Sequence, residues 1–284
     1  MHTYAQRRYR EMLMNDQEMF EKVAAATGFI AALDQSGGST PKALRGYGIE
    51  EDAYSTEDEM FGLIHDMRSR IITSPSFSGD KVLGAILFER TMDGDADGKP
   101  VPDALRDRGV VPFLKVDKGL EDEADGVQMM KPMPELDALL QRAKAKGVFG
   151  TKKRSVINKA SPSGIAAIVQ QQFEVAEQIL AHGLIPMIEP EINIKSADRV
   201  QSDVILRDEI LKALDNVSGD NKVMLKLSIP AEAGTFDALV SHPRVLRVVA
   251  LSGGFARPEA CVELAKNKAL DSGVLRFSTS RGIQ

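Results

Sequence analysis

Tryptophan is absent from this chain of 284 residues, and only one cysteine, Cys261, is present. A single cysteine cannot form an internal disulfide, which argues against a disulfide-rich secreted domain and favours a reducing compartment. No apolar run approaches the ~18 residues of a membrane-spanning helix, and the arginine-rich first residues precede no apolar signal segment. We therefore predict a cytoplasmic protein that does not bind membranes.

An excess of basic residues is also lacking. The chain has 36 lysines and arginines against 41 acidic residues, for a net charge of -5. This balance gives no global field that attracts nucleic acid, so any bound anion must be held by local residues. Cysteine and histidine pairs at the spacing of zinc ligands are missing as well. We expect neither a nucleic-acid partner nor a metal or other cofactor.

What the chain does contain is a series of short, continuously apolar runs. They lie at residues 29–33, 84–88, 111–114, 148–150, 184–188, 222–225, 247–251 and 274–277. Such runs are typical of parallel strands covered by helices. Helical patterns separate several of them, at 55–67, 134–146, 162–182, 198–216, 236–240 and 258–268. Because the glycine fingerprint of a dinucleotide-binding sheet follows no run, the pattern predicts an α/β fold, a single-domain (β/α)8 TIM barrel.

The barrel is expected to span residues 29–284, preceded at 1–28 by an N-terminal extension and a helix. Asn15 and Glu18 are placed to cap this helix, which would close the barrel bottom or lie on its surface. The Asp- and Gly-rich segment 93–102 is predicted to be a surface loop. After the last apolar run too few residues remain for a helix of ~10 residues, so we expect the final barrel helix to be missing.

Ionisable residues gather at the carboxyl ends of the predicted strands, where TIM barrels place their active sites. One such residue alone is more often an ordinary charged strand end than a functional group. Several converging from different strands are harder to explain by packing. They are Asp34, Lys115, Asp117, Lys152, Arg154, Glu189, Glu191 and Lys226.

Lys226 is distinguished by its apolar neighbours within residues 224–229. Desolvation disfavours an ammonium ion, and a free amine attacks carbonyl groups. The alternative is a lysine whose amine reaches solvent at the strand end. Lys115 and Lys152 are competing nucleophiles, but each lies in a denser run of charge that suits ion pairing or phosphate contact.

Three carboxylates accompany these lysines. Glu189 and Glu191 flank Pro190, and the extended geometry around proline predicts that they point to opposite sides. A carboxylate beside a lysine adduct is suited to proton transfer during imine formation, and Asp34 could share that duty. Salt bridges to the lysines are the alternative, and both interpretations can hold together.

Two loops with consecutive glycines follow the first and seventh predicted strands, at residues 35–40 and 251–254. Consecutive glycines let backbone N–H groups converge on an anion, and serine hydroxyls add donors. The second loop lies where barrels commonly bind phosphate, and Arg281 follows the eighth strand closely. Either loop alone is more often a tight turn, but together they predict a substrate with two phosphates.

These segments resemble the class I, Schiff-base fructose-bisphosphate aldolases in their bacterial form, from residue 29 to 284. The stretches that carry the resemblance are 31–39, 114–119, 150–154, 188–191, 224–226 and 251–254. The resemblance implies a lyase that cleaves fructose 1,6-bisphosphate to glycerone phosphate and glyceraldehyde 3-phosphate, in glycolysis and gluconeogenesis. It implies no cofactor and leaves a homo-oligomer open.

The resemblance also implies roles for single residues. Lys226 would form the iminium, Glu189 and Lys152 would assist dehydration of the carbinolamine, and Asp34 would take the proton of the hydroxyl whose collapse breaks the carbon–carbon bond. The implied phosphate ligands are Ser252, Gly253, Gly254, Ser278 and Arg281 at one end, and Ser36, Ser39 and Lys115 at the other, with Arg154 nearby. The family's Phe-Ser-then-Arg pattern is lengthened here, at residues 277–281.

Two other functions are weighed against this one. A different lysine-dependent barrel aldolase would act on a singly phosphorylated sugar, which the two glycine loops disfavour. An inactive sugar-phosphate-binding scaffold would keep the fold without turnover, which the intact set of Lys226, Glu189 and Asp34 disfavours.

Overall fold

Eight parallel strands form a closed ring in the computed structural model, which describes residues 13–36, 38–267 and 277–279. β11 pairs with β1 and β5 pairs with β7, so the ring is continuous. Each predicted apolar run overlaps one strand, which confirms the TIM barrel. The strands are β1 (Phe29–Leu33), β2 (Val82–Leu87), β5 (Val111–Lys115), β7 (Gly150–Ile157), β8 (Ile185–Ile192), β9 (Val223–Ser228), β10 (Val245–Leu251) and β11 (Phe277–Thr279).

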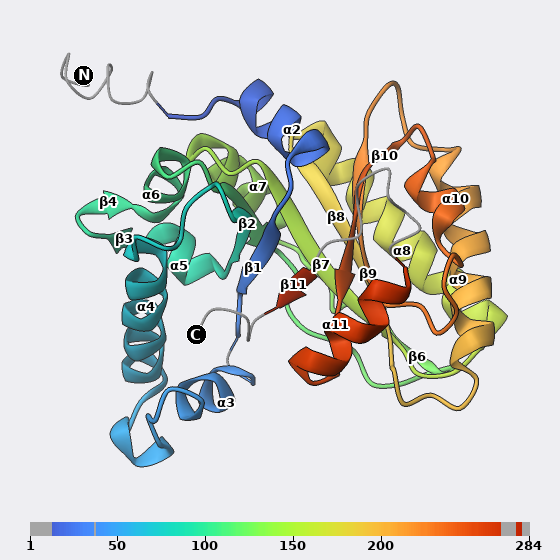
Figure 1. Ribbon diagram of the computed structural model, residues 1–284, viewed down its shortest axis with the longest axis horizontal. Helices are drawn as coiled ribbons and strands as arrows, with labels where there is room; N and C mark the ends of the chain where they lie inside the picture. The colour runs from blue at the N-terminus through green and yellow to red at the C-terminus, as the bar shows by residue number, and fades with distance from the viewer. Residues whose placement is uncertain (1–12, 37, 268–276, 280–284) are drawn as a thin grey trace.

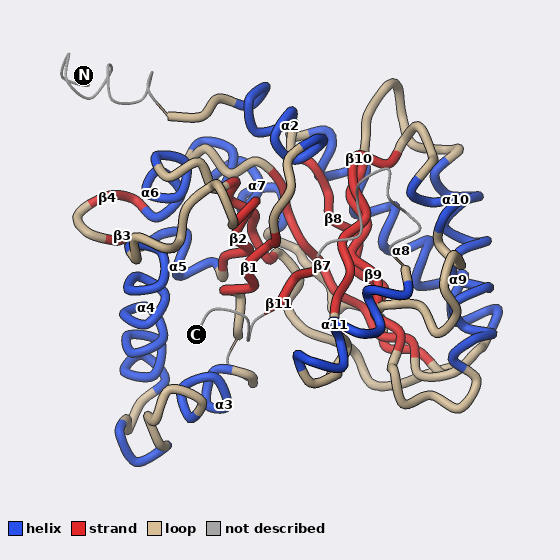
Figure 2. Tube along the Cα trace, in the orientation of Figure 1, coloured by secondary structure: helices blue, strands red, loops and turns tan. Residues whose placement is uncertain are grey.

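Helices surround this ring (Figures 1 and 2), with α4, α6 and α7 over one side and α8, α9 and α10 over the other. The short helices α3, α5 and α6 were not predicted, because helices of five to seven residues show little helical periodicity. The expectation that the final helix is missing concerns residues after Thr279, which lie outside the described part of the chain. The helices around the ring are α3 (Thr40–Arg45), η1 (Glu51–Ala53), α4 (Glu57–Thr73), α5 (Glu89–Asp93), α6 (Val101–Asp107), α7 (Leu136–Ala145), α8 (Pro162–Ala181), α9 (Arg199–Leu214), α10 (Asp237–Val240) and α11 (Arg257–Lys266).

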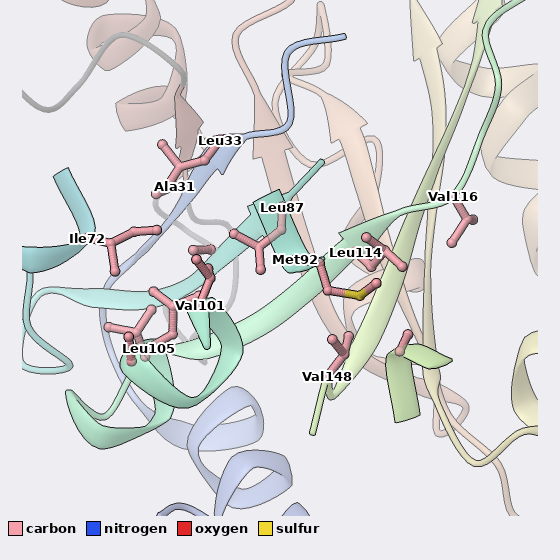
Figure 3. Close-up of a cluster of buried hydrophobic side chains, with 14 of the residues drawn as sticks. Ala31, Leu33, Ile72, Leu87, Met92, Val101, Leu105, Leu114, Val116 and Val148 are labelled. Atoms are coloured by element: carbon pink, nitrogen blue, oxygen red, sulfur yellow. The ribbon is translucent and has the colours of Figure 1, made fainter. Parts of the chain in front are cut away.

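Apolar layers between strands and helices fix the strands in place. Figure 3 shows one of them, in which Leu33, Leu87 and Leu114 from three strands meet Ile72 of α4 and Leu105 of α6. A second cluster joins β7 to β10 with α8 and α9. Full burial of such a side chain contributes about 1.5–3 kcal/mol to the stability of the fold. Because these layers lie outside the ring, the inner faces of the strand ends are available for polar residues.

The bottom of the barrel is closed by α2 (Asp16–Ala25). Its predicted cap is present, because Asn15 Oδ1 accepts from the Glu18 N–H and the Glu18 carboxylate accepts from the Asn15 N–H. Met19 and Val23 are fully buried in the cluster inside the barrel, together with Ile30, Phe113 and Met224. Of the two predicted placements, the helix therefore takes the one at the barrel bottom.

The prediction of a plain surface loop at 93–102 is wrong. β3 (Asp95–Ala96) and β4 (Lys99–Pro100) form a small antiparallel hairpin, and α6 starts immediately after it. The tip is sharply turned, with φ of 52° at Asp97 and 71° at Gly98, while Ala96 is buried. The Asp and Gly content identified the turn, but not the buried apolar residue beside it.

A further short strand, β6 (Val127–Gln128), pairs antiparallel with the end of β7.

Candidate active site

The register of neighbouring strands brings the predicted catalytic groups to one level of the barrel. Lys115 on β5 is the register partner of Lys152 on β7, so both side chains leave the sheet on the same face. Lys152 is in turn paired with Met187, and Met187 with Met224. Two residues further along β8 and β9 stand Glu189 and Lys226, which therefore point to the same side.

Direct contacts join four of the predicted residues into one chain of ion pairs. Lys226 Nζ donates to Glu189 Oε1 over 2.6 Å. Lys152 Nζ lies 3.0 Å from Glu189 Oε2 and 3.0 Å from Asp34 Oδ2. Lys226 is only 6% exposed, so its amine does not reach bulk solvent as the alternative interpretation required. The predicted salt bridges exist, and they connect the same groups to which catalytic roles were assigned.

Electrostatics fixes the protonation of two neighbouring members of this chain, Asp34 and Lys152. Burial alone would raise the pKa of Asp34, but Lys152 and Lys226 outweigh it, so this pKa lies below its ordinary value. Burial would likewise lower the pKa of Lys152, but Asp34 and Glu189 together raise it. At neutral pH Asp34 is therefore a carboxylate and Lys152 a fixed cation, which leaves Lys152 unsuited to act as a nucleophile.

One sequence expectation about β7 and β8 is wrong. The charged residues lie towards the ends of these strands, as expected, and the strands continue past them to Ile157 and Ile192. Charge does not end them, because inward-facing acids and bases on the two strands neutralise each other. Glu189 and Glu191 were expected on opposite sides of Pro190, but both contact inward-facing residues of β7. Residues two apart in a strand share a face.

A second set of ion pairs surrounds Asp117, which is 6% exposed beyond the end of β5. Asp117 accepts from Lys115 Nζ at 2.6 Å and from the Arg154 N–H at 3.2 Å. The Arg154 side chain donates to Glu191 over 2.5 Å. The sequence showed Asp117 and Glu191 as acids at strand ends but offered no sign of their partners. Two of the predicted phosphate ligands, Lys115 and Arg154, are thus each held by a carboxylate.

The two glycine loops lie where expected, after β1 and β10. In the first, the Ser36 N–H donates to Ser39 Oγ, with Ser39 exposed at the start of α3. Gly37 lies outside the described residues. In the second, Gly253 and Gly254 have φ of 59° and 115°, and a Cβ on Gly253 would meet Ile194 Cγ2 at 2.6 Å. Only glycine fits at this position, so the conformation of the second loop depends on Gly253.

The remaining predicted phosphate ligands are Ser278, on the last strand, and Arg281. The backbone of Ser278 pairs beside Ile30 of β1 and Leu251 of β10, which puts it between the two glycine loops in the strand order. Arg281 lies outside the described residues.

Sequence reasoning missed Arg68, a fully buried arginine on α4 that binds the residue after Asp34. A signal for it exists. Arg68 occupies a position on the stripe formed by Met60, Ile64, Met67 and Ile72, where an apolar side chain is expected. A charged residue on such a stripe indicates a buried partner.

Lys153, between the two inward-facing basic residues of β7, points the other way into the layer beneath α8. It is fully buried, and its amine has no hydrogen-bond partner among the described residues. Burial, opposed only in part by Asp117, lowers the pKa of Lys153 to about 7. An unpaired buried amine costs stability, because nothing replaces the water it has lost.

Replacing Lys153 with methionine should therefore stabilise the protein near pH 7, by about 1–3 kcal/mol. The pKa is lower in the folded state than the ordinary 10.5, so the unfolded state binds more protons between these values. The stability of the unmodified chain should rise across that window, and the advantage of Lys153→Met should shrink towards pH 10. Urea unfolding of both proteins near pH 7 and near pH 10 checks this. A destabilised variant, or an advantage independent of pH, would contradict it.

Two features are absent from the described residues, 13–36, 38–267 and 277–279. No helix within them is both long and apolar enough to span a bilayer. No group of three or more histidine, cysteine, aspartate and glutamate side chains within them is arranged to hold a metal ion.

Comparison with known proteins adds the deciding observation. A family model described as fructose-bisphosphate aldolase class-I matches residues 17–230, about three quarters of the chain. The chain belongs to this family. Its fold is also that of a solved fructose-bisphosphate aldolase from Plasmodium falciparum, a structure determined in complex with TRAP and a small-molecule inhibitor. The TM-score is 0.74 at 22% sequence identity, with 94% of this chain and 84% of that chain covered.

Membership makes the aldolase described here a lyase that acts on a sugar bisphosphate, fructose 1,6-bisphosphate, as the sequence resemblance implied. Nothing favours the two alternative functions, an aldolase for a singly phosphorylated sugar and an inactive scaffold, over cleavage of fructose 1,6-bisphosphate. The matched residues include the whole chain of ion pairs from Asp34 to Lys226. They end before the loop at 252–254, whose role must be argued from its geometry.

Proposed function

We propose that Lys226 is the nucleophile that forms the Schiff base with the ketone carbon of fructose 1,6-bisphosphate. The observation that carries this is the 2.6 Å contact between Lys226 Nζ and Glu189 in a site from which bulk water is nearly excluded. Lys226 has a base within reach that can take its proton. Lys152, the neighbouring buried lysine, is held as a cation between two carboxylates.

The first half of the reaction would use Glu189 and Lys152. Glu189 accepts a proton from Lys226, and the free amine attacks the ketone carbon to form a carbinolamine. Glu189 then returns a proton to the carbinolamine hydroxyl, and one water leaves as the iminium forms. The fixed charge of Lys152 stabilises the negative charge that develops on that oxygen.

The second half would use Asp34. Its carboxylate accepts the proton of the hydroxyl beside the scissile bond, and the resulting oxygen electron pair forms the aldehyde as the carbon–carbon bond breaks. The electrons of that bond move towards the iminium nitrogen and leave an enamine. Protonation of the enamine and addition of one water release glycerone phosphate and restore Lys226. The lowered pKa of Asp34 keeps it ready to accept a proton at neutral pH.

Two groups of residues would hold the phosphates on either side of this centre. At one end we propose the turn at Ser252, Gly253 and Gly254 together with Ser278 and Arg281. At the other end we propose Ser36, Ser39 and Lys115, with Arg154 nearby. Lys115 and Arg154 are paired with Asp117 and Glu191. A phosphate at that end would therefore compete with these carboxylates for the same N–H donors.

Reductive trapping tests the proposal. Borohydride added with fructose 1,6-bisphosphate should reduce the iminium to a stable secondary amine, and mass spectrometry of the digested protein should place it on Lys226. The amine must be within reach of the substrate for this to occur. An adduct on Lys115 or Lys152, or no adduct, would overturn the assignment.

A further inference from the structure

Arg68 is a buried charge, and two of its three side-chain hydrogen bonds go to Gln35, the residue after Asp34. Its Nη2 donates to the Gln35 carbonyl at 2.7 Å and to Gln35 Oε1 at 3.2 Å. Its Nη1 donates to Thr91 Oγ1 at 2.7 Å. Gln35 directly follows Asp34, so one guanidinium holds both the main chain and the side chain of the next residue.

Gln35 in turn forms a hydrogen bond to the backbone that precedes Asp34. Its amide nitrogen donates to the Ala32 carbonyl at 3.0 Å. The backbone on both sides of Asp34 is therefore tied, through Gln35, to Arg68. Thr40 Oγ1 adds a weaker bond to the Gln35 carbonyl, at 3.4 Å.

An aromatic column holds the guanidinium in turn. The Arg68 Cζ lies 5.9 Å from the centroid of the Phe88 ring, and Phe88 stacks on Phe61 with centroids 5.4 Å apart. The Arg90 Cζ lies over the Phe61 ring, 4.4 Å from its centroid. Because Phe88 follows β2 and Thr91 lies on α5, Arg68 joins α4 to the ends of two barrel strands.

Such a buried arginine is costly as a purely structural element. A buried charge and its partners can often be replaced by apolar residues without loss of stability. Burial lowers the pKa of Arg68 to about 10, partly opposed by Asp34, so the group remains charged at neutral pH. What an apolar residue could not supply is a rigid, forked set of donors aimed at one peptide.

We propose that Arg68 is a positioning residue for Asp34. It fixes the peptide that follows Asp34, so that the carboxylate stays on Lys152 and faces the hydroxyl whose proton it accepts. This inference rests on the proposed role of Asp34. It predicts that loss of the forked donors slows carbon–carbon cleavage and spares Schiff-base formation, because Lys226, Glu189 and Lys152 form no hydrogen bond or ion pair with Arg68.

The test is Arg68→Lys, which keeps the charge and loses the fork. We expect kcat for cleavage to fall roughly 10- to 100-fold, the effect of a small misplacement of a reacting group, with KM within about twofold. Borohydride trapping with fructose 1,6-bisphosphate should still modify Lys226 to the same extent. The mass of the adduct should shift from the three-carbon product to the uncleaved six-carbon sugar, since the block falls after iminium formation.

Matched variants separate positioning from folding. Arg90→Lys makes the same substitution at the other end of the aromatic column and should leave kcat and the adduct mass unchanged. Thr91→Val removes one acceptor of Arg68 and should give a smaller shift in the same direction, about threefold, and it decides the question if Arg68→Lys does not fold.

Three outcomes would count against the proposal or its basis. Normal cleavage by Arg68→Lys would overturn it. A parallel loss of cleavage and trapping in a folded variant would overturn it too, since that indicates general damage to the site. An unmodified Lys226 in the parent enzyme would instead refute the proposed function itself, whatever Arg68 does.

Discussion

Replacing Lys226 with methionine should abolish cleavage of fructose 1,6-bisphosphate, with kcat reduced on the order of 10⁵-fold, as for the loss of other catalytic nucleophiles. Methionine has a similar length and suits the apolar surroundings of this buried position, so the fold should be retained while the amine is lost. Lys152 cannot replace it, because Asp34 and Glu189 hold its nitrogen and raise its pKa. The measurement is the rate of glyceraldehyde 3-phosphate formation, with circular dichroism to verify folding.

Lys153→Met is the matched control for this experiment. It removes another buried lysine, on the outer face of β7, and should keep kcat within about twofold because Lys153 faces the helix layer. A folded Lys226→Met enzyme that retained a tenth or more of the parent rate would disprove the assigned nucleophile.

Replacing Lys152 with methionine should cost about 3–5 kcal/mol of stability, the cost of leaving buried charges without their partner. Asp34 and Glu189 share the Lys152 ammonium at 3.0 Å each, and Asp34 is bonded to no other lysine among the described residues. Activity should fall as well, because the pKa of Asp34 would rise once its nearest cation is gone. Urea unfolding near pH 7 measures the loss of stability.

The pH dependence of that loss gives a second check. The lowered pKa of Asp34 stabilises the parent above the unfolded value of about 3.9, and this contribution disappears as pH falls through the folded pKa. The raised pKa of Lys152 contributes below its ordinary 10.5 and is lost only as pH rises through the higher folded value. The deficit of Lys152→Met should thus be largest around neutral pH and shrink below pH 4.

An exposed pair provides the control for Lys152. Lys118 lies 2.8 Å from Glu89 with about half of its side chain exposed, and Lys118→Met should change stability by less than about 1 kcal/mol. Equal losses for the two variants would mean that burial does not set the cost.

The barrel and most of its site could be predicted because each depends on a local pattern. Eight apolar runs specify eight strands, and the charged residues that follow them in the chain must meet at one mouth. The pairing of the charged residues could not be predicted in the same way. Arg154 and Glu191 were expected at the ends of two strands, but the sequence does not show that each neutralises the other.

Arg68 shows a different limit. Its position on an apolar stripe was visible in the sequence, but its partners, Gln35 and Thr91, come from segments far away in the chain. Lys152 and Lys153 are adjacent lysines whose side chains point to opposite faces of β7. Lys152 is a fixed cation in the barrel mouth, whereas Lys153 lies under the helices with a pKa of about 7. The partners of Arg68 and the directions of the two lysines both depend on tertiary structure.

The alternation along β7 also bears on how this strand finds its place during folding. Thr151, Lys153 and Ser155 face the helices while Lys152 and Arg154 face the mouth, so polar side chains occupy both faces and hydrophobicity alone specifies the register weakly. A slip of one residue would put either Thr151 in the place of Lys152 or Ser155 in the place of Arg154. The first would leave Asp34 and Glu189 without their shared cation, and the second would leave Glu191 without its cation. The acids on β1 and β8 thus select the correct register, and the residues proposed for catalysis also guide assembly of the barrel.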